Sequence, residues 1–141
     1  MAPPQFFAGR AGVLTVTGFG ERGAPLALVY WTHDAGDDWR ASRVPISGPA
    51  GSIGIANALT AWVIGSRRSG RRMVFDRVFR TADAGRHWQL RRLPFDADGY
   101  QLDALSPSVA YAVRPYPGRP AIVVTRDGGA SWQAIPTRVG S

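Results

Sequence analysis

The stretch Thr32-His-Asp-Ala-Gly-Asp-Asp-Trp39 occurs twice more in altered form, as Thr81-Ala-Asp-Ala-Gly-Arg-His-Trp88 and as Thr125-Arg-Asp-Gly-Gly-Ala-Ser-Trp132. Thr, Asp, Gly and Trp keep the same offsets each time, and the copies start 49 and then 44 residues apart. Repetition at this spacing is typical of proteins in which one supersecondary unit is stacked against the next. The repeat therefore points to the architecture of the chain.

Each repeated residue type suits a tight turn between two strands. Asp and Thr side chains accept hydrogen bonds from backbone N–H groups that a turn leaves without a ladder partner. Glycine supplies a positive φ that other residues adopt only at a cost. Trp begins the next strand with a large apolar surface. We therefore interpret the repeated residues as structural: Thr32, Asp34, Gly36, Trp39, Thr81, Asp83, Gly85, Trp88, Thr125, Asp127, Gly129 and Trp132.

Apolar runs on both sides of each copy predict strands. Residues 27–31, 73–79 and 121–124 lead into the three copies, and the run after each copy ends at Pro45, Pro94 or Pro136. Further upstream, residues 12–17, 60–65 and 109–113 predict second strands, and residues 6–7, 52–56 and 100–104 predict inner strands. We expect an all-β chain, a single partial β-propeller over residues 1–141, with four-stranded antiparallel blades at about 5–46, 52–94 and 99–136.

The pattern Thr-x-Asp-x-Gly-x-x-Trp resembles the Asp-box (BNR) repeat of β-propellers. That repeat occurs in sialidases and other glycoside hydrolases, in sortilin-type receptors, and in photosystem II assembly factors of the WD40/YVTN/BNR-like group. The resemblance covers most of the chain. It implies that each copy closes the turn between the third and fourth strands of a blade, away from the ligand face, and it carries no catalytic role onto these residues.

Positive charge is concentrated in the middle repeat. The formal net charge is +7, every basic residue is Arg, and residues 52–94 hold nine Arg against two Asp. A hairpin tip predicted at residues 66–72 contains the candidate anion-binding residues Arg67, Arg68, Arg71 and Arg72. Charge and aromatic surface on the flanking strands are expected from Arg77, Arg80, Arg91, Arg92, Trp62, Phe75 and Phe79. The alternative is a solvated strand edge in a bacterial protein whose high-GC genome favours Arg.

The sequence offers little for catalysis or metal binding. A glycosidase needs a positioned carboxyl pair, or in sialidases a Tyr with an acid partner. Glu21 is isolated in a predicted loop, and the Arg-Ile-Pro segment that a sialidase resemblance implies is absent. There is no cysteine, His33 and His87 lie in different turns, and Asp96-x-Asp98 lacks the other ligands of a calcium loop. We predict no catalytic residue, metal site or cofactor.

The main functional hypothesis is a non-enzymatic scaffold or binding module whose ligand is a glycan or other polyanion. The alternative is a fragment of a sialidase-like or other glycoside hydrolase propeller whose catalytic residues lie mostly outside this chain. Three blades are fewer than the four to eight that close a ring, so we expect either a homodimer or the remainder of a longer propeller. The sequence shows no signal peptide or membrane-spanning pattern, although the family that it resembles is often exported.

Overall fold

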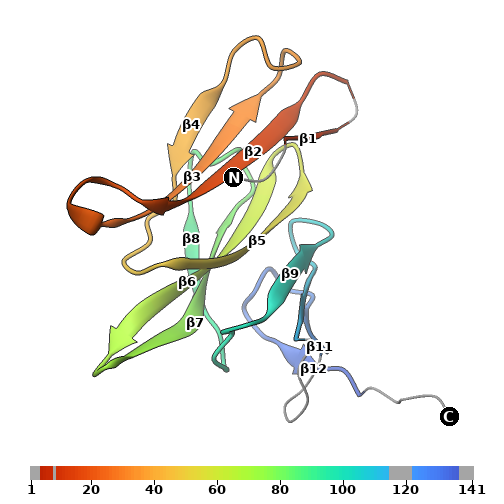
Figure 1. Ribbon diagram of the computed structural model, residues 1–141. Coiled ribbons are helices and arrows are strands. Elements are labelled where there is room, and N and C mark those ends of the chain that lie inside the picture. Colours follow the sequence, from red (N-terminus) through yellow and green to blue (C-terminus); the bar gives the residue numbers. More distant parts are fainter. Residues whose placement is uncertain (1–3, 8, 115–121, 137–141) are drawn as a thin grey trace, which may run out of the picture.

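The computed structural model describes residues 4–7, 9–114 and 122–136, which form three four-stranded antiparallel sheets (Figure 1). Sheet 1 contains β1 (Gln5–Phe6), β2 (Gly12–Phe19), β3 (Pro25–Thr32) and β4 (Arg40–Arg43). Sheet 2 contains β5 (Ala50–Asn57), β6 (Thr60–Ser69), β7 (Arg72–Thr81) and β8 (Gln89–Arg92). Sheet 3 contains β9 (Gln101–Ala104), β10 (Ala110–Val113), β11 (Ile122–Thr125) and β12 (Gln133–Ala134).

Within each sheet the strands lie in chain order, so consecutive strands pair with each other. Along the chain the sheets also follow one another, and the first strands β5 and β9 contact each other. A short 3-10 helix, η1 (Glu21–Gly23), lies between β2 and β3. Within the described residues, no helix has the length and apolar character needed to cross a membrane.

The predicted strands are found, with shifted ends. The largest difference concerns residues 66–72, which are not a loop. β6 continues through Ser69 and β7 starts at Arg72, so that only Gly70 and Arg71 lie between them. Gly70 has a φ of 62°, which suits a two-residue hairpin turn. In the predicted loop at residues 114–120 and the strand at 121–124, residues 115–121 lie outside the described part of the chain.

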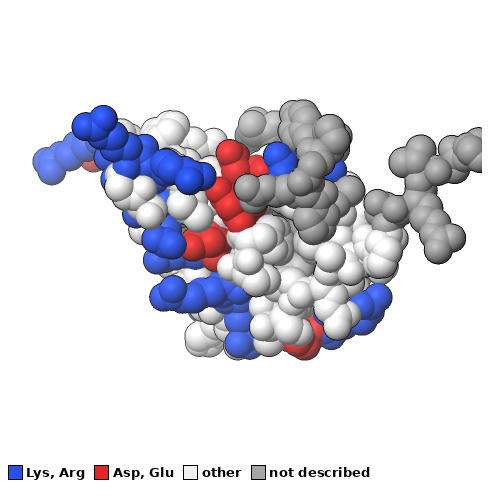
Figure 2. Space-filling view, turned by 90° about the horizontal axis from the view of Figure 1, so that it is seen from below, with Lys and Arg blue, Asp and Glu red and all other residues white. Residues whose placement is uncertain are grey.

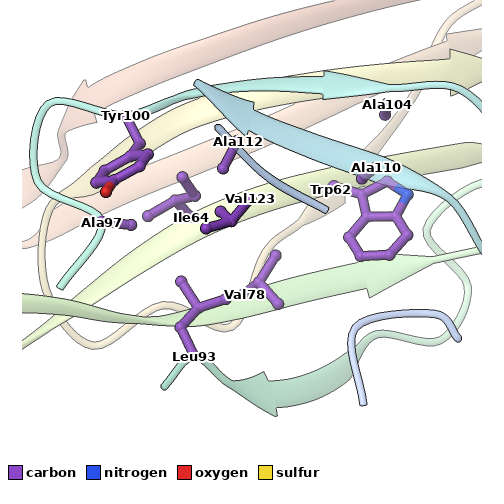
Figure 3. Packing of buried hydrophobic residues seen from close by; sticks show 10 residues of the cluster. All are labelled: Trp62, Ile64, Val78, Leu93, Ala97, Tyr100, Ala104, Ala110, Ala112 and Val123. Atoms are coloured by element: carbon purple, nitrogen blue, oxygen red, sulfur yellow. The ribbon is translucent and has the colours of Figure 1, made fainter. Parts of the chain in front are cut away.

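Two apolar layers hold the sheets together, because side chains along a strand alternate between its two faces. One face of sheet 2 packs against sheet 1, and this first core layer contains Val13, Val29, Trp31, Ala61, Val63 and Phe79. The other face packs against sheet 3, and this second core layer contains Trp62, Ile64, Val78, Ala110, Ala112 and Val123 (Figure 3). Sheet 2 is therefore covered on both faces.

Sheet 1 keeps an apolar outer face. Leu14 on β2 lies opposite Tyr30 on β3, and the next pair on this face is Val16 with Leu28. These four side chains are only half-buried, so the interpretation of Tyr30 as core was wrong. The matching pair in sheet 2, Val63 opposite Phe79, is 0% and 4% exposed because sheet 1 covers it. The outer face of sheet 1 thus repeats the pattern of a covered face.

The fold separates two ends of the sheets. The hairpin between the second and third strands lies at one end, and the repeated turn between the third and fourth strands lies at the other. In sheet 2, β7 runs from Arg72 at the hairpin end to Thr81 at the turn end. Ten residues at about 3.3 Å each place these ends roughly 30 Å apart. Arginines near Arg72 and residues of the turn near Thr81 therefore belong to different surfaces.

Candidate functional site

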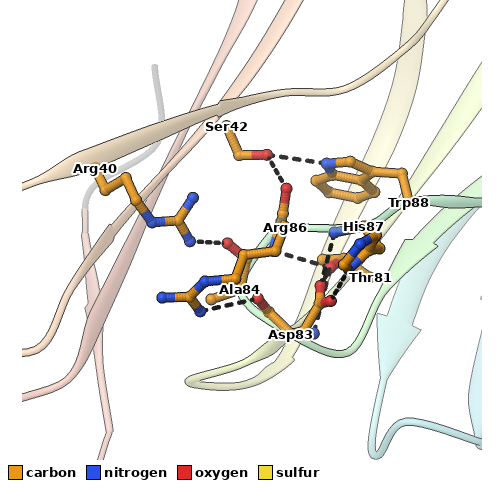
Figure 4. A network of polar contacts seen from close by, with 9 residues as sticks. Arg40, Ser42, Thr81, Asp83, Ala84, Arg86, His87 and Trp88 are labelled. Carbon is orange, nitrogen blue, oxygen red and sulfur yellow. Dashed lines mark hydrogen bonds and ion pairs between the residues drawn. The ribbon is translucent and has the colours of Figure 1, made fainter.

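The three repeated turns share one hydrogen-bond pattern; they are named turn 1 (Thr32–Trp39), turn 2 (Thr81–Trp88) and turn 3 (Thr125–Trp132). In turn 2, Thr81 Oγ1 donates to Asp83 Oδ1 and accepts from the Gly85 N–H, both at 2.9 Å. Asp83 Oδ1 also accepts from the His87 N–H at 2.9 Å (Figure 4). Turns 1 and 3 contain the same three bonds at 2.7–3.0 Å. This geometry accounts for the fixed offsets of Thr, Asp and Gly.

Each turn contains two consecutive residues with positive φ, where the sequence analysis expected one. The residue before the shared glycine is Ala35 (φ 61°), Ala84 (φ 58°) or Gly128 (φ 73°). Alanine in this left-handed region costs roughly 1–2 kcal/mol relative to its right-handed conformation. The Gly128-Gly129 pair in turn 3 was the one signal in the sequence for this conformation.

The second carboxylate oxygen distinguishes the turns. Asp83 Oδ2 lies 2.6 Å from His87 Nδ1, and Asp127 Oδ2 accepts from Ser131 Oγ at 2.5 Å. Bonds from His87 and from Ser131 are the largest causes that lower the pKa of Asp83 and of Asp127 to about 2. The pKa of Asp34 is also lowered, mainly by the Asp38 backbone N–H. Its turn carries Asp38 where the others carry His87 or Ser131, and an ionised carboxylate cannot donate a hydrogen bond.

Turn 2 is also hydrogen-bonded to the neighbouring sheet (Figure 4). Ser42 on β4 donates its hydroxyl to the Gly85 carbonyl at 2.7 Å and accepts from Trp88 Nε1 at 2.9 Å. Arg40, on the same strand, donates to the Ala84 carbonyl. Ser42 is 5% exposed, so these bonds are buried. The sequence analysis missed Ser42 and Arg40, because both lie outside the repeated pattern.

The structure divides the arginine hairpin, defined as Arg67, Arg68, Arg71 and Arg72. Arg67 binds Asp76 on the adjacent strand, with Nη2 and Nε at 2.9 and 3.0 Å from Asp76 Oδ2. That ion pair neutralises Arg67. Arg68, Arg71 and Arg72 are exposed, and none of them forms an ion pair with another described residue. Figure 2 looks from the lower edge of Figure 1 and shows basic side chains gathered on one side of this face, with acidic side chains nearer its middle.

The flanking residues do not all join this surface. Arg77 and Arg92 lie opposite each other on β7 and β8, away from the turn end. Arg80 instead lies near the turn end, where Nη1 donates to Gln89 Oε1 at 2.7 Å and the guanidinium lies 5.7 Å from the centre of the Trp62 ring. Arg91 contacts Gly129 of turn 3. Grouping Arg80 and Arg91 with the arginine hairpin was therefore wrong, as was placing the buried Trp62 and Phe79 on its surface.

The acids and histidines are dispersed. Glu21 is exposed in η1, His33 is exposed in turn 1, and His87 is bound to Asp83 in turn 2. Over the described ranges, no three or more His, Cys, Asp or Glu side chains are grouped so that they could hold a metal ion. The arrangement favours recognition by exposed arginines over chemistry by paired carboxylates.

Comparison with known proteins supports the architecture. No protein-family model matches the chain, and no curated protein matches it at a significant level. The chain is similar to a solved structure titled "YCF48 bound to D1 peptide", with a TM-score of 0.51 and 17% identity over 94% of this chain and 46% of that one. It is also similar to YCF48 from Cyanidioschyzon merolae, with a TM-score of 0.51 and 22% identity over 94% of this chain and 39% of that one.

The chain thus spans less than half the length of these two YCF48 structures. YCF48 is a β-propeller, and its likeness to this chain extends over all three sheets. The chain therefore has an all-β fold of three four-stranded antiparallel β-propeller blades.

Proposed function

We propose that this chain is a non-enzymatic binding module of the Asp-box (BNR) propeller type, and that its hairpin end binds an acidic peptide segment of a protein partner. The observation that carries this proposal is the exposed cluster of Arg68, Arg71 and Arg72. These arginines project from one two-residue turn, and the Arg67–Asp76 ion pair fixes the strands beneath them. Guanidinium groups suit carboxylates, because their N–H donors match the two oxygens.

The peptide is preferred over a glycan because of the comparison with YCF48, of which one structure contains a D1 peptide. An acidic peptide and a sulfated glycan both satisfy the charge of the cluster. The propeller likeness supports a binding or assembly role for the chain, and a peptide is the one ligand class named among its structural neighbours.

Titration of the protein with a fluorescein-labelled peptide containing six consecutive Asp residues tests the proposal. We expect binding that weakens steeply between 50 and 300 mM salt, because exposed charge pairs are screened. Replacing Arg68, Arg71 and Arg72 together by Ser removes the cluster and is expected to weaken binding at least ten-fold. The matched control replaces Arg10, Arg86 and Arg126, which lie at the turn end, and loses the same charge. Equal loss in both triple variants would show that only net charge matters.

A heparin titration identifies the ligand class. Under the proposal, heparin competes with the peptide only through the same arginines and with no greater affinity per charge. If heparin binds the protein and the acidic peptide does not, the peptide proposal is wrong and the glycan hypothesis replaces it.

We further propose that the twelve residues shared by the turns are structural, that residues 1–141 are one unit with blades at about 5–46, 52–94 and 99–136, and that further blades cover its end sheets. The outer face formed by Leu14, Val16, Leu28 and Tyr30 supports the last point, because its pattern is that of a covered face. A second copy of this chain and the rest of a longer propeller are the two sources of such blades. Light scattering distinguishes them: a stable dimer supports the first, and aggregation of the isolated chain supports the second. A compact monomer that unfolds cooperatively would contradict both.

A further inference from the structure

A cavity of about 460 Å³ lies between turn 1 of sheet 1 and turn 2 of sheet 2. It is at the turn end, roughly 30 Å from the arginine hairpin. Its volume is within the range of small-molecule sites in proteins. Its walls are mostly apolar, with four polar or charged side chains at the edge. The lining includes Trp31, Trp39, Leu59, His33, Asp38, Arg40 and Arg86.

The equivalent position at the second sheet–sheet interface is spanned by protein. Trp31 immediately precedes Thr32 of turn 1, and Arg80 immediately precedes Thr81 of turn 2. Arg80 crosses to the β9–β10 loop and donates to the Pro107 carbonyl at 2.5 Å. The corresponding loop at the first interface contains Ala58 and Leu59, and both of these line the cavity. An indole in place of the arginine thus leaves a space where the second interface has a bridge.

The polar groups around the cavity favour an anion. Arg40 is bonded to the Ala84 carbonyl, and Arg86 donates Nη1 to the Asp83 carbonyl at 3.4 Å, so each guanidinium is positioned at the wall with further N–H groups. The Trp31 indole N–H is buried and has no hydrogen-bond partner in the described part of the chain, and Trp31 is 5% exposed. A buried donor without a partner is uncommon and costs stability unless a ligand or water satisfies it. The one carboxylate in the lining is Asp38.

We propose that this cavity binds a small aromatic carboxylate. The aromatic ring packs between the indoles of Trp31 and Trp39, and the carboxylate accepts hydrogen bonds from Arg40 and Arg86. The site is independent of the peptide surface at the hairpin end, so each proposal can fail without the other.

The probes are naphthalene-2-carboxylate and its neutral amide, naphthalene-2-carboxamide, which has nearly the same shape. Binding is followed by the indole N–H resonances in ¹H–¹⁵N spectra, with Trp31 assigned from Trp31→Phe. We expect the carboxylate to shift the Trp31 resonance with saturation, and the amide to bind at least ten-fold more weakly. Arg86→Glu is expected to weaken carboxylate binding at least ten-fold. The matched control is Arg126→Glu, which makes the same charge change in turn 3 and is expected to bind like the parent.

Three results would overturn the proposal. The Trp31 resonance could stay unmoved at millimolar carboxylate. Equal weakening by Arg86→Glu and Arg126→Glu would show nonspecific attraction by net charge. Binding of a peptide that ends in naphthylalanine, without binding of the free acid, would make the ligand a peptide terminus instead. All variants are first checked for parental thermal unfolding, and Arg86→Gln replaces Arg86→Glu if the latter does not fold.

Discussion

The two interfaces between the sheets use the same turn in different ways. At the first interface, turn 2 is hydrogen-bonded to sheet 1 through Ser42, three residues after Trp39. At the second, the equivalent residue of β8 is Arg91, and the Trp132 indole N–H has no hydrogen-bond partner in the described chain. Trp132 packs edge-on against Trp62, with ring centroids 6.4 Å apart. The repeat therefore specifies the turn, whereas the residues outside the repeat specify how the turn binds its neighbour.

The largest expected effect comes from the shared glycine. A Cβ at Gly85 would lie 2.3 Å from Ser42 Oγ, whereas a Cβ at Gly129 would lie 3.2 Å from the Trp62 ring. Both residues have positive φ. Gly85→Ala should lower the free energy of unfolding by about 2–5 kcal/mol through strain and overpacking, and Gly129→Ala by about 1–2 kcal/mol. Urea denaturation measures both. Equal losses would mean that the hydrogen-bonded interface is not the tighter one.

Ser42→Ala should be the next largest. It leaves the Trp88 N–H and the Gly85 carbonyl without their partner in a buried site, which costs about 1–3 kcal/mol. The same denaturation experiment applies, with Ser69→Ala at the exposed end of β6 as control and an expected change below about 0.5 kcal/mol. If Ser42→Ala changed stability no more than this control, the polar contact would not distinguish the interfaces.

A smaller, stabilising effect is expected at Ala35, which is exposed because no described sheet packs against turn 1 on that side. Glycine relieves the strain of its φ of 61°, so Ala35→Gly should raise the free energy of unfolding by about 0.5–1 kcal/mol. Ala84→Gly should gain less, since the Ala84 methyl group is 7% exposed in the first core layer. Thermal unfolding compares the two variants. A loss of stability in Ala35→Gly would argue against the left-handed conformation.

The smallest expected effect is a change in one pKa. Asp38→Ser places a hydroxyl donor where turn 3 has Ser131, so the pKa of Asp34 should fall further, as hydrogen bonding lowers that of Asp127. A folded-state pKa below the unfolded one adds stability above about pH 4, and that stability is lost as pH falls through the folded-state pKa. Carboxyl ¹³C titration measures Asp34 directly. Asp37→Ser removes the same charge one residue earlier, and an equal shift there would refute the hydrogen-bond explanation.

Much of the fold could be predicted because the repeat and the apolar alternation are local signals. Strand existence and order follow from residues such as 27–31 and 73–79, together with the turn chemistry of Thr81, Asp83 and Gly85. The positive φ of Ala35 and Ala84 could not be read in the same way, because alanine does not favour that region.

The candidate site was less accessible to sequence reasoning. Four clustered arginines look equivalent in a sequence, but a register shift between Gly65 and Arg67 accompanies the pairing of Arg67 with Asp76. The cavity depends on Trp31 and Arg40 of sheet 1 meeting Ala84 and Arg86 of sheet 2. Such contacts between residues more than 40 positions apart depend on how the sheets pack, which no local pattern records.

The most direct test of the account measures stability and peptide binding together in two variants. Asp83→Ala removes the acceptor that braces turn 2, so we expect a lower melting temperature and unchanged affinity for the acidic peptide per folded molecule. The Ser replacement of Arg68, Arg71 and Arg72 should keep the melting temperature and weaken binding at least ten-fold. A normal melting curve with lost binding in Asp83→Ala would contradict the central claim that the turns are structural and the hairpin end binds.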